Sequence, residues 1–256
     1  MALLDYAFAI LYYTFWCIGV LVFMCHSTRP LATLFRYFKK PLPQFKELYG
    51  RKNEPSWVVL IGLDDLTLEY GRLLADQGFQ LLICKDLSSP HRFSSAKFHE
   101  IKVEGSIEEI TFDSAECTKP ECFKHLQVAL EDKNLALIVC NIDYMSDSNE
   151  ASSNLNSVQK TVELNCTTFG LIMRTILPYV RENKARCGIL NVTSMMGVEG
   201  FPTYATYCGA QAYQNFMTIG LWKFVQEKAD CLSYQPYIVR KNTFENVESF
   251  FAISPR

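Results

Sequence analysis

Short runs of apolar residues alternate with segments of helical periodicity along most of this chain, and this alternation limits the folds available to it. An apolar run of this length is typical of a strand buried on both faces of a parallel sheet. The predicted strands are Trp57–Gly62, Phe79–Cys84, His99–Val103, Leu135–Asn141, Cys187–Thr193 and Cys231–Tyr237. The predicted helices are Thr67–Gln77, Pro120–Asp132, Val158–Asn183 and Tyr207–Lys228, with Ser249–Ile253 as a candidate last strand. This order predicts an α/β fold with a doubly wound parallel sheet.

The N-terminal segment has a different character. From Tyr6 to Cys25 it contains no charged residue and no proline. A helix over this segment would span about 30 Å, the thickness of the hydrocarbon core of a bilayer. A cleaved signal peptide is the alternative, but it would need a basic residue near its start, and Met1–Asp5 has none. We therefore expect an N-terminal transmembrane helix in which residues 6–25 contact membrane lipid.

Basic residues follow this segment, and they predict its orientation. They are Arg29, Arg36, Lys39, Lys40 and Lys46. The positive-inside rule places such a flank, and the domain behind it, on the cytosolic or matrix side of the membrane. The predicted organisation is a transmembrane anchor (residues 1–28), a basic juxtamembrane connector with a short helix at Leu31–Phe38 (residues 29–54), and an α/β domain (residues 55–256).

Charge and cysteine content exclude several classes of protein. The 25 basic and 27 acidic residues give a net charge of −2, which argues against a nucleic-acid partner. The ten cysteines form no CxxC pair, and the four histidines show no metal-ligand spacing, so no metal site is expected. Cysteine behaves as a small buried hydrophobe, and free thiols persist in reducing compartments. We expect a single-pass membrane protein whose domain faces a reducing side.

Three polar residues follow the predicted strands in a specific order. Asn165 lies in the fourth-to-fifth strand connection, Ser194 ends the segment Asn191-Val192-Thr193-Ser194, and Tyr207 opens the next helix. This order and spacing resembles the catalytic residues of the short-chain dehydrogenase/reductases, over Trp57 to about Val239. The N-terminal anchor, the Tyr49-Gly50 to Trp57-Val58-Val59 entry and Pro236-Tyr237 are similar to the membrane-bound 17β-hydroxysteroid dehydrogenase and very-long-chain 3-oxoacyl-CoA reductase group. The resemblance implies a Rossmann-type domain.

In that family the tyrosine exchanges a proton with the substrate oxygen, the serine binds the same oxygen, and the asparagine holds a water. A lysine four residues after the tyrosine lowers the pKa of the tyrosine and binds the nicotinamide ribose. Here Asn165, Ser194 and Tyr207 match, but Gln211 stands at the lysine position and carries no charge. Without that charge the pKa of Tyr207 is poorly matched to proton transfer at neutral pH. The set is therefore predicted to be vestigial.

The cofactor motifs depart from the family pattern as well. Of the glycines in the phosphate loop only Gly62 remains, and aspartates at 64 and 65 bring negative charge to the start of the helix. We expect one of these aspartates to cap that helix itself. Asn141 is the one asparagine kept after the fourth strand, and Asp86 ends the second strand, where an acidic side chain favours NAD over NADP. Gly62, Asp86 and Asn141 are thus a degenerate dinucleotide site.

These observations favour a pseudoenzyme that is a structural subunit of a membrane protein assembly, for example a respiratory-chain complex, with no cofactor. Its partners would be other membrane proteins, in the mitochondrial inner membrane or the endoplasmic reticulum. Few residues follow Pro236-Tyr237, which leaves little chain for a substrate lid. One alternative is an active NAD(P)-dependent 3-oxoacyl-CoA or hydroxysteroid reductase with a modified catalytic set. A second alternative is a non-catalytic module that still binds NAD(H) or NADP(H).

Overall fold

The structure is a computed structural model that describes residues 2–38, 45–52, 54–62, 64–86, 106–113, 120–145, 155–236, 238–239 and 252–253. Its contacts divide the chain into two units, Met1–Pro43 and Gln44–Arg256. The first unit is the helix α1 (Ala2–Phe38), which includes the short helix predicted at Leu31–Phe38. Its large apolar side chains between Tyr6 and Met24 are exposed. Within the described part of the chain, we find no helix with both the length and the apolarity that crossing a membrane requires.

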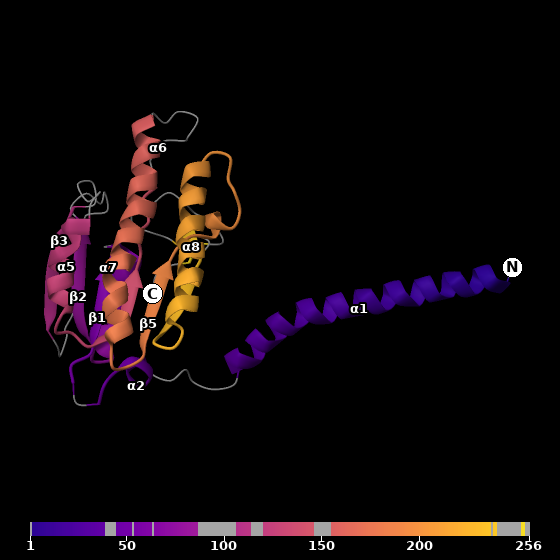
Figure 1. The fold of residues 1–256 in the computed structure, drawn as a ribbon, viewed down its shortest axis with the longest axis horizontal. Coiled ribbons are helices and arrows are strands. Elements are labelled where there is room, and N and C mark those ends of the chain that lie inside the picture. The colour runs from indigo at the N-terminus through magenta and orange to yellow at the C-terminus, as the bar shows by residue number, and fades with distance from the viewer. Residues whose placement is uncertain are drawn as a thin grey trace. The chain divides into compact units, whose positions relative to one another are not determined.

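The second unit is built on a six-stranded sheet in the order β3-β2-β1-β4-β5-β6, with every neighbouring pair parallel (Figure 1). The strands are β1 (Trp57–Ile61), β2 (Gln80–Asp86), β3 (Ile107–Phe112), β4 (Leu135–Cys140), β5 (Cys187–Val192) and β6 (Ala229–Tyr234). This order reverses direction between β1 and β4, which is the Rossmann-type doubly wound topology. The predicted fold class is therefore confirmed for the sheet. The predicted strand His99–Val103 lies outside the described residues, and β3 follows it in the sequence.

The short helix α2 (Phe45–Tyr49) precedes β1. Among the described residues, the helices between strands are α3 (Asp65–Asp76), α5 (Lys124–Leu130), α6 (Leu155–Val162), α7 (Thr168–Glu182) and α8 (Ala205–Val225). The 3₁₀ turns η1 (Pro120–Phe123) and η3 (Met195–Gly197) precede α5 and α8. The single helix predicted at Val158–Asn183 is divided by a π-helical turn, η2 (Glu163–Thr167). Two short strands, β7 (Ile238–Val239) and β8 (Ala252–Ile253), pair in parallel, so the candidate last strand joins β7.

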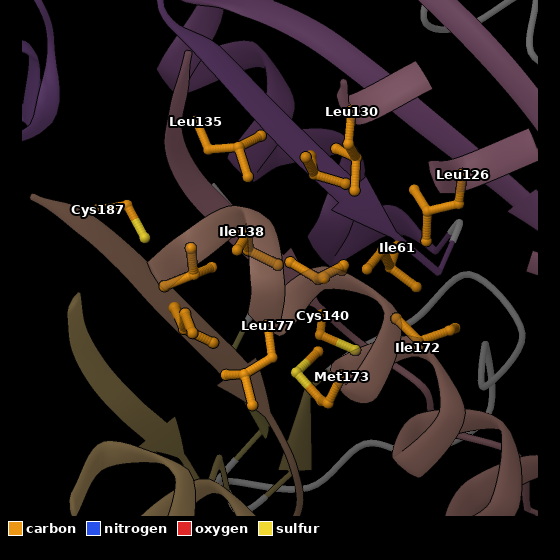
Figure 2. Packing of buried hydrophobic residues seen from close by; sticks show 14 of the residues in the cluster. Ile61, Leu126, Leu130, Leu135, Ile138, Cys140, Ile172, Met173, Leu177 and Cys187 are labelled. Carbon is orange, nitrogen blue, oxygen red and sulfur yellow. The ribbon is translucent and has the colours of Figure 1, made fainter. Parts of the chain in front are cut away.

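Two apolar layers cover the faces of the sheet, because alternate residues of a buried strand point to opposite sides. On one face, Ile61, Ile138 and Cys140 pack against Ile172 and Met173 of α7 (Figure 2). The other face holds a separate cluster that joins β1 and β2 to α3 through Leu74 and Ala75. Burying each large aliphatic side chain contributes about 1.5–3 kcal/mol, so these layers are the main source of stability.

The helix α2 is bound at the edge where the strands begin. Lys46 Nζ donates to the carbonyl oxygen of Gly78, just before β2, at 3.2 Å. The Tyr49 hydroxyl donates to Oδ2 of Asp230, in β6, at 3.1 Å. Asp230 also accepts two hydrogen bonds from the guanidinium of Arg186. These contacts attach α2 to the segment before β2 and to the outer strand β6, at the end of the sheet opposite the candidate site.

Candidate functional site

The candidate site lies at the carboxyl ends of the parallel strands. Gly62 directly follows β1, Asp86 ends β2, and Asn141 directly follows β4. Ser194 follows β5 and caps the 3₁₀ turn η3, where its Oγ accepts a hydrogen bond of 3.2 Å from the amide of Met196. Ligands of doubly wound folds bind at this edge, near the point where the strand order reverses. The sheet therefore gathers the predicted residues at one edge.

Tyr207 lies buried in the first turn of α8, with its hydroxyl group directed at the loop that follows β4. The hydroxyl donates a hydrogen bond of 2.5 Å to Oδ1 of Asp143. Burial raises the pKa of Tyr207 well above its ordinary value, and the nearby Asp143 carboxylate raises it further. A hydrogen bond with Ser194 lowers the pKa, but this effect is smaller. Tyr207 is thus held in its neutral, proton-donating form, with Asp143 as the acceptor.

The loop that carries Asp143 is held by two side chains. Asn165, in the π-helical turn, donates to the carbonyl oxygen of Tyr144 at 2.7 Å and accepts from the amide of Tyr144 at 3.0 Å. Its second amide hydrogen goes to Thr161. Gln214 Nε2 donates to the carbonyl oxygen of Ile142 at 2.9 Å. The backbone is therefore fixed on both sides of Asp143, and the side-chain amide of Asn165 is fully used by backbone groups.

Gln211 is completely buried one turn after Tyr207 on α8. Within the described structure neither Nε2 nor Oε1 of Gln211 has a hydrogen-bond partner. Gly197 of η3 packs directly against it, because a Cβ atom at Gly197 would lie 2.8 Å from the backbone carbon of Gln211. A lysine ammonium group at this position would lower the pKa of Tyr207, whereas the neutral amide of Gln211 has no such effect. The pKa of Tyr207 is therefore set mainly by burial and by the Asp143 carboxylate.

Gly62 has a conformation that requires glycine. Its φ angle is +87°, and a Cβ atom would lie 1.9 Å from the carbonyl oxygen of Asn141. The amide of Asn141 in turn donates to the carbonyl oxygen of Ile61 at 2.8 Å. The glycine therefore allows the backbones after β1 and β4 to come into contact. This contact accounts for Gly62 without reference to a bound phosphate.

Asp64 caps α3, as predicted for one of the two aspartates. Its Oδ1 accepts from the amide of Thr67 at 2.9 Å, from the Thr67 hydroxyl at 2.9 Å and from Nδ2 of Asn141 at 2.7 Å. All three residues are buried. A helix N-terminus binds anions through such amides, and here a carboxylate of the chain itself takes that place. The residues present therefore do not fit the pyrophosphate of a dinucleotide.

Sequence reasoning missed the direct partner of Tyr207. The short-chain dehydrogenase/reductases that the sequence resembles have the motif Asn-Asn-Ala/Val-Gly after the fourth strand. Here it is Cys140-Asn141-Ile142-Asp143, and the replacement of its glycine by Asp143 was the available signal. Its contact with Tyr207 depends on the packing of α8 against the loop after β4, which no local pattern reveals. A metal site was not expected from the sequence. Among the described residues, no group of three or more His, Cys, Asp or Glu side chains could hold a metal ion.

Comparison with known proteins agrees with this fold. The short chain dehydrogenase family profile matches residues 57–248. An oxidoreductase from E. coli superposes with a TM-score of 0.68 at 14% identity, covering 83% of this chain and 87% of that one. A short-chain dehydrogenase from Sphingobium yanoikuyae in complex with NADPH superposes with a TM-score of 0.66 at 14% identity, covering 79% and 80% of the two chains. The fold, with the candidate site at the carboxyl ends of its parallel strands, is that of a Rossmann domain of the oxidoreductase type.

The chain belongs to the short chain dehydrogenase family. A very-long-chain 3-oxoacyl-CoA reductase from Ajellomyces capsulatus (strain NAm1 / WU24) is 24% identical over 171 residues, which are 65% of this chain and 49% of the relative. The match thus spans about half the length of that curated protein. It agrees with the subgroup that the N-terminal segment, the entry to the first strand and Pro236-Tyr237 resemble.

Proposed function

We propose that this chain is a non-catalytic short chain dehydrogenase domain that serves as a structural subunit of a membrane protein assembly. The observation that carries the proposal is the hydrogen bond from Tyr207 to Asp143, in a site where Gln211 replaces the lysine. A proton donor that is committed to a neighbouring carboxylate is not presented to a substrate oxygen.

The proton chemistry is the first support. A general acid or base works best when its pKa lies near the working pH. Burial and the Asp143 carboxylate both move the pKa of Tyr207 away from that range. Asn165 is the second support, because its side-chain amide is bound to the backbone of Tyr144 and Thr161 rather than turned toward the site. Two of the three residues that match the family motif, Asn165 and Tyr207, thus act here as parts of the fold.

The third support is the start of α3, where the pyrophosphate of a dinucleotide would bind. A pyrophosphate would have to displace the Asp64 carboxylate from the amide of Thr67 and from Asn141. It would also bring its own negative charge beside that carboxylate, in a buried place where charges repel strongly. The interior of this edge is thus filled by a network that stabilises the start of α3.

The N-terminal helix supports attachment to a membrane. Its exposed large apolar side chains lie on every side of the helix, among them Phe8, Ile10, Trp16, Leu21 and Phe23. An apolar surface of this kind is unfavourable in water and favourable in lipid. We propose that residues 6–25 contact lipid and that other membrane proteins are the partners of the domain. Extraction of membranes at alkaline pH tests this part, because a protein held by lipid stays in the pellet.

An active reductase is the second candidate, and one observation favours it. The 24% identical relative is a 3-oxoacyl-CoA reductase, and Ser194 and Tyr207 remain hydrogen-bonded to one another here. In this alternative a substrate would break the bond between Tyr207 and Asp143. The candidate requires that a nicotinamide cofactor displace Asp64 from the start of α3.

Turnover separates the two candidates. The purified full chain in detergent is given NADPH or NADH with a long-chain 3-oxoacyl-CoA, and loss of absorbance at the reduced nicotinamide band is followed. We expect no turnover above that of a Tyr207→Phe variant. A rate in the ordinary enzyme range of about 1–1000 per second that Tyr207→Phe abolishes would contradict the proposal. Native co-purification then identifies the membrane partners.

A further inference from the structure

The short helix α2 has one face that binds the domain and another that does not. Lys46 and Tyr49, three residues apart, hydrogen-bond to the segment before β2 and to β6. Phe45 and Leu48 are also three residues apart, so they share a different face of the helix. They are 46% and 51% exposed, although both are large apolar residues. α2 is therefore held on the domain by one face and presents apolar side chains on another.

A third exposed apolar residue lies on the side of α3 that contacts α2. The amide of Phe45 donates to Oε1 of Gln77, at the end of α3, at 3.0 Å. Leu73 is four residues before Gln77, so both side chains lie on the same side of α3. Leu73 is 56% exposed. Phe45, Leu48 and Leu73 are here called the α2 patch. α2 lies at the amino ends of the strands, away from the candidate site (Figure 1).

The connector that contains α2 carries an excess of positive charge. Residues 29–54 include seven basic and two acidic residues, whereas the whole chain has a net charge of −2. One of the two acidic residues, Glu54, pairs with Arg51. Each Lys or Arg near an anionic bilayer strengthens binding about fivefold. A basic segment with an apolar patch fits the surface of an anionic bilayer, because apolar side chains enter the lipid just below the headgroups.

The length of the chain between the proposed lipid segment and α2 permits this contact. α1 continues for thirteen residues after Cys25, to Phe38, which along a helix is about 20 Å. Six further residues precede Phe45, and a chain of that length reaches at most about 20–25 Å. α2 can therefore return to the bilayer surface. Because the anchor keeps α2 at a high effective concentration beside lipid, a small apolar patch suffices.

We propose that α2 is a second membrane contact, in which the α2 patch enters the headgroup region of an anionic bilayer and the basic connector binds its headgroups. This inference rests on the proposed attachment of residues 6–25 to lipid. The amino ends of the strands then face the membrane, and the carboxyl ends, with Tyr207 and Asp143, face away from it. Strands of this length place the candidate site roughly 20 Å farther from the lipid. Partner subunits reach that edge outside the bilayer.

Photo-crosslinking of the purified full chain in vesicles of phosphatidylcholine and phosphatidylserine tests the contact. The photoreactive residue p-benzoylphenylalanine replaces one residue at a time, and a chain–lipid adduct is detected by mass. We expect a lipid adduct from Leu48→p-benzoylphenylalanine, and also from the same replacement at Ile10 in α1. The replacement at Val198, directly after η3 at the candidate site, is the matched control and should give no adduct. All three residues are exposed, so the thermal midpoint should not change.

Removal of charge tests the part given to the connector. Lys39→Gln combined with Lys40→Gln should lower the rate of adduct formation at position 48 by about fivefold or more, because two charges near the anionic surface are lost. Lys124→Gln combined with Lys160→Gln removes the same charge from exposed lysines of α5 and α6. This control should leave the rate unchanged. Equal effects of the two pairs would show that the connector does not bind the headgroups.

The outcomes at positions 10, 48 and 198 separate this inference from its premise. An adduct at 10 without one at 48 overturns the α2 contact and leaves the attachment of residues 6–25 intact. No adduct at either position overturns both. Labelling at 198 as strong as at 48, or crosslinking of position 48 to protein instead of lipid, also overturns the α2 contact. The turnover assay separately tests whether the domain is catalytic.

Discussion

The hydroxyl of Tyr207 and the carboxylate of Asp143 are joined by a hydrogen bond of 2.5 Å, although the two residues are 64 positions apart in the sequence. The bond connects the first turn of α8 to the loop after β4. Asn165 and Gln214 fix the backbone on both sides of Asp143. Tyr207 and Asn165, two of the residues that match the family motif, thus both bond to the loop after β4.

The titration of Tyr207 follows from this bond. The folded pKa of Tyr207 lies well above its unfolded value near 10, mainly through burial. Its contribution to stability is therefore complete below pH 10 and is lost as the pH rises through the folded pKa. We expect the tyrosinate absorbance difference between the natural protein and Tyr207→Phe to be absent at pH 10. Asp143→Asn removes the charge that opposes ionisation, so ionisation of Tyr207 should begin at lower pH. Ionisation near neutral pH in the natural protein would contradict the arrangement.

Asp64 should contribute more to stability than its neighbour Asp65. Replacing a helix cap by alanine costs about 0.5–2 kcal/mol, and here Asn141 and Thr67 also lose their acceptor. We expect Asp64→Ala to lower the free energy of unfolding by about 2–3 kcal/mol in urea titrations. Asp65→Ala, in the first turn of the same helix, should cost less than about 1 kcal/mol. Equal effects of the two substitutions would show that the network around Asp64 is not formed.

Two glycines with positive φ angles allow a matched comparison. At Gly62 a Cβ atom would lie 1.9 Å from a backbone oxygen, whereas at Gly78 it would lie 2.5 Å from the flexible end of Lys46. Both alanine variants are strained in φ, but only Gly62→Ala forces the backbone to move. We expect Gly62→Ala to cost about 4 kcal/mol or more, and Gly78→Ala about 1–2 kcal/mol. A smaller loss for Gly62→Ala than for Gly78→Ala would contradict the contact between the backbones after β1 and β4.

The contact between Tyr49 and Asp230 predicts two pH effects. The pKa of Tyr49 is raised to about 12, mainly by burial, so its contribution is present below pH 10 and is lost as the pH rises through 12. The pKa of Asp230 is lowered, mainly by the hydrogen bond from Arg186, so its contribution is lost as the pH falls through the folded value. Tyr49→Phe should cost about 1 kcal/mol at neutral pH and remove the alkaline loss. Chemical denaturation across a range of pH measures the free energy of unfolding of both proteins. If the natural chain and Tyr49→Phe lose stability equally at alkaline pH, the role given to Tyr49 is wrong.

Much of the sheet follows from local pattern, because continuous apolar strands such as Trp57–Ile61 and Leu135–Cys140 have few alternatives to a buried parallel sheet. The strand β3 was not predicted, since the adjacent Glu108 and Glu109 interrupt its apolar residues, and this half-exposed edge strand has no continuous apolar run. The division between α6 and α7 was also missed. A π-helical turn depends on tertiary contacts such as those of Asn165, and helical periodicity does not register it.

The candidate site could be predicted in part. The ends of β1, β4 and β5 place Gly62, Asn141 and Ser194 at one edge, and the sequence identifies each of them. The capping of α3 by an aspartate is a local signal, and it is confirmed at Asp64. The bond from Tyr207 to Asp143 and the complete burial of Gln211 arise from the packing of α8 on the sheet, and local sequence carries no information on either.

The central claim is that this edge of the sheet is occupied by side chains of the chain itself, and dinucleotide binding tests it most directly. The full chain in detergent is titrated with NADH and with NADPH by calorimetry. An Asp64→Gly, Asp143→Gly, Gln211→Lys variant is titrated in parallel. We predict no saturable binding by the natural chain up to millimolar concentrations, and measurable binding once the two carboxylates are removed and the lysine is present. A micromolar dissociation constant for the natural chain would contradict the account.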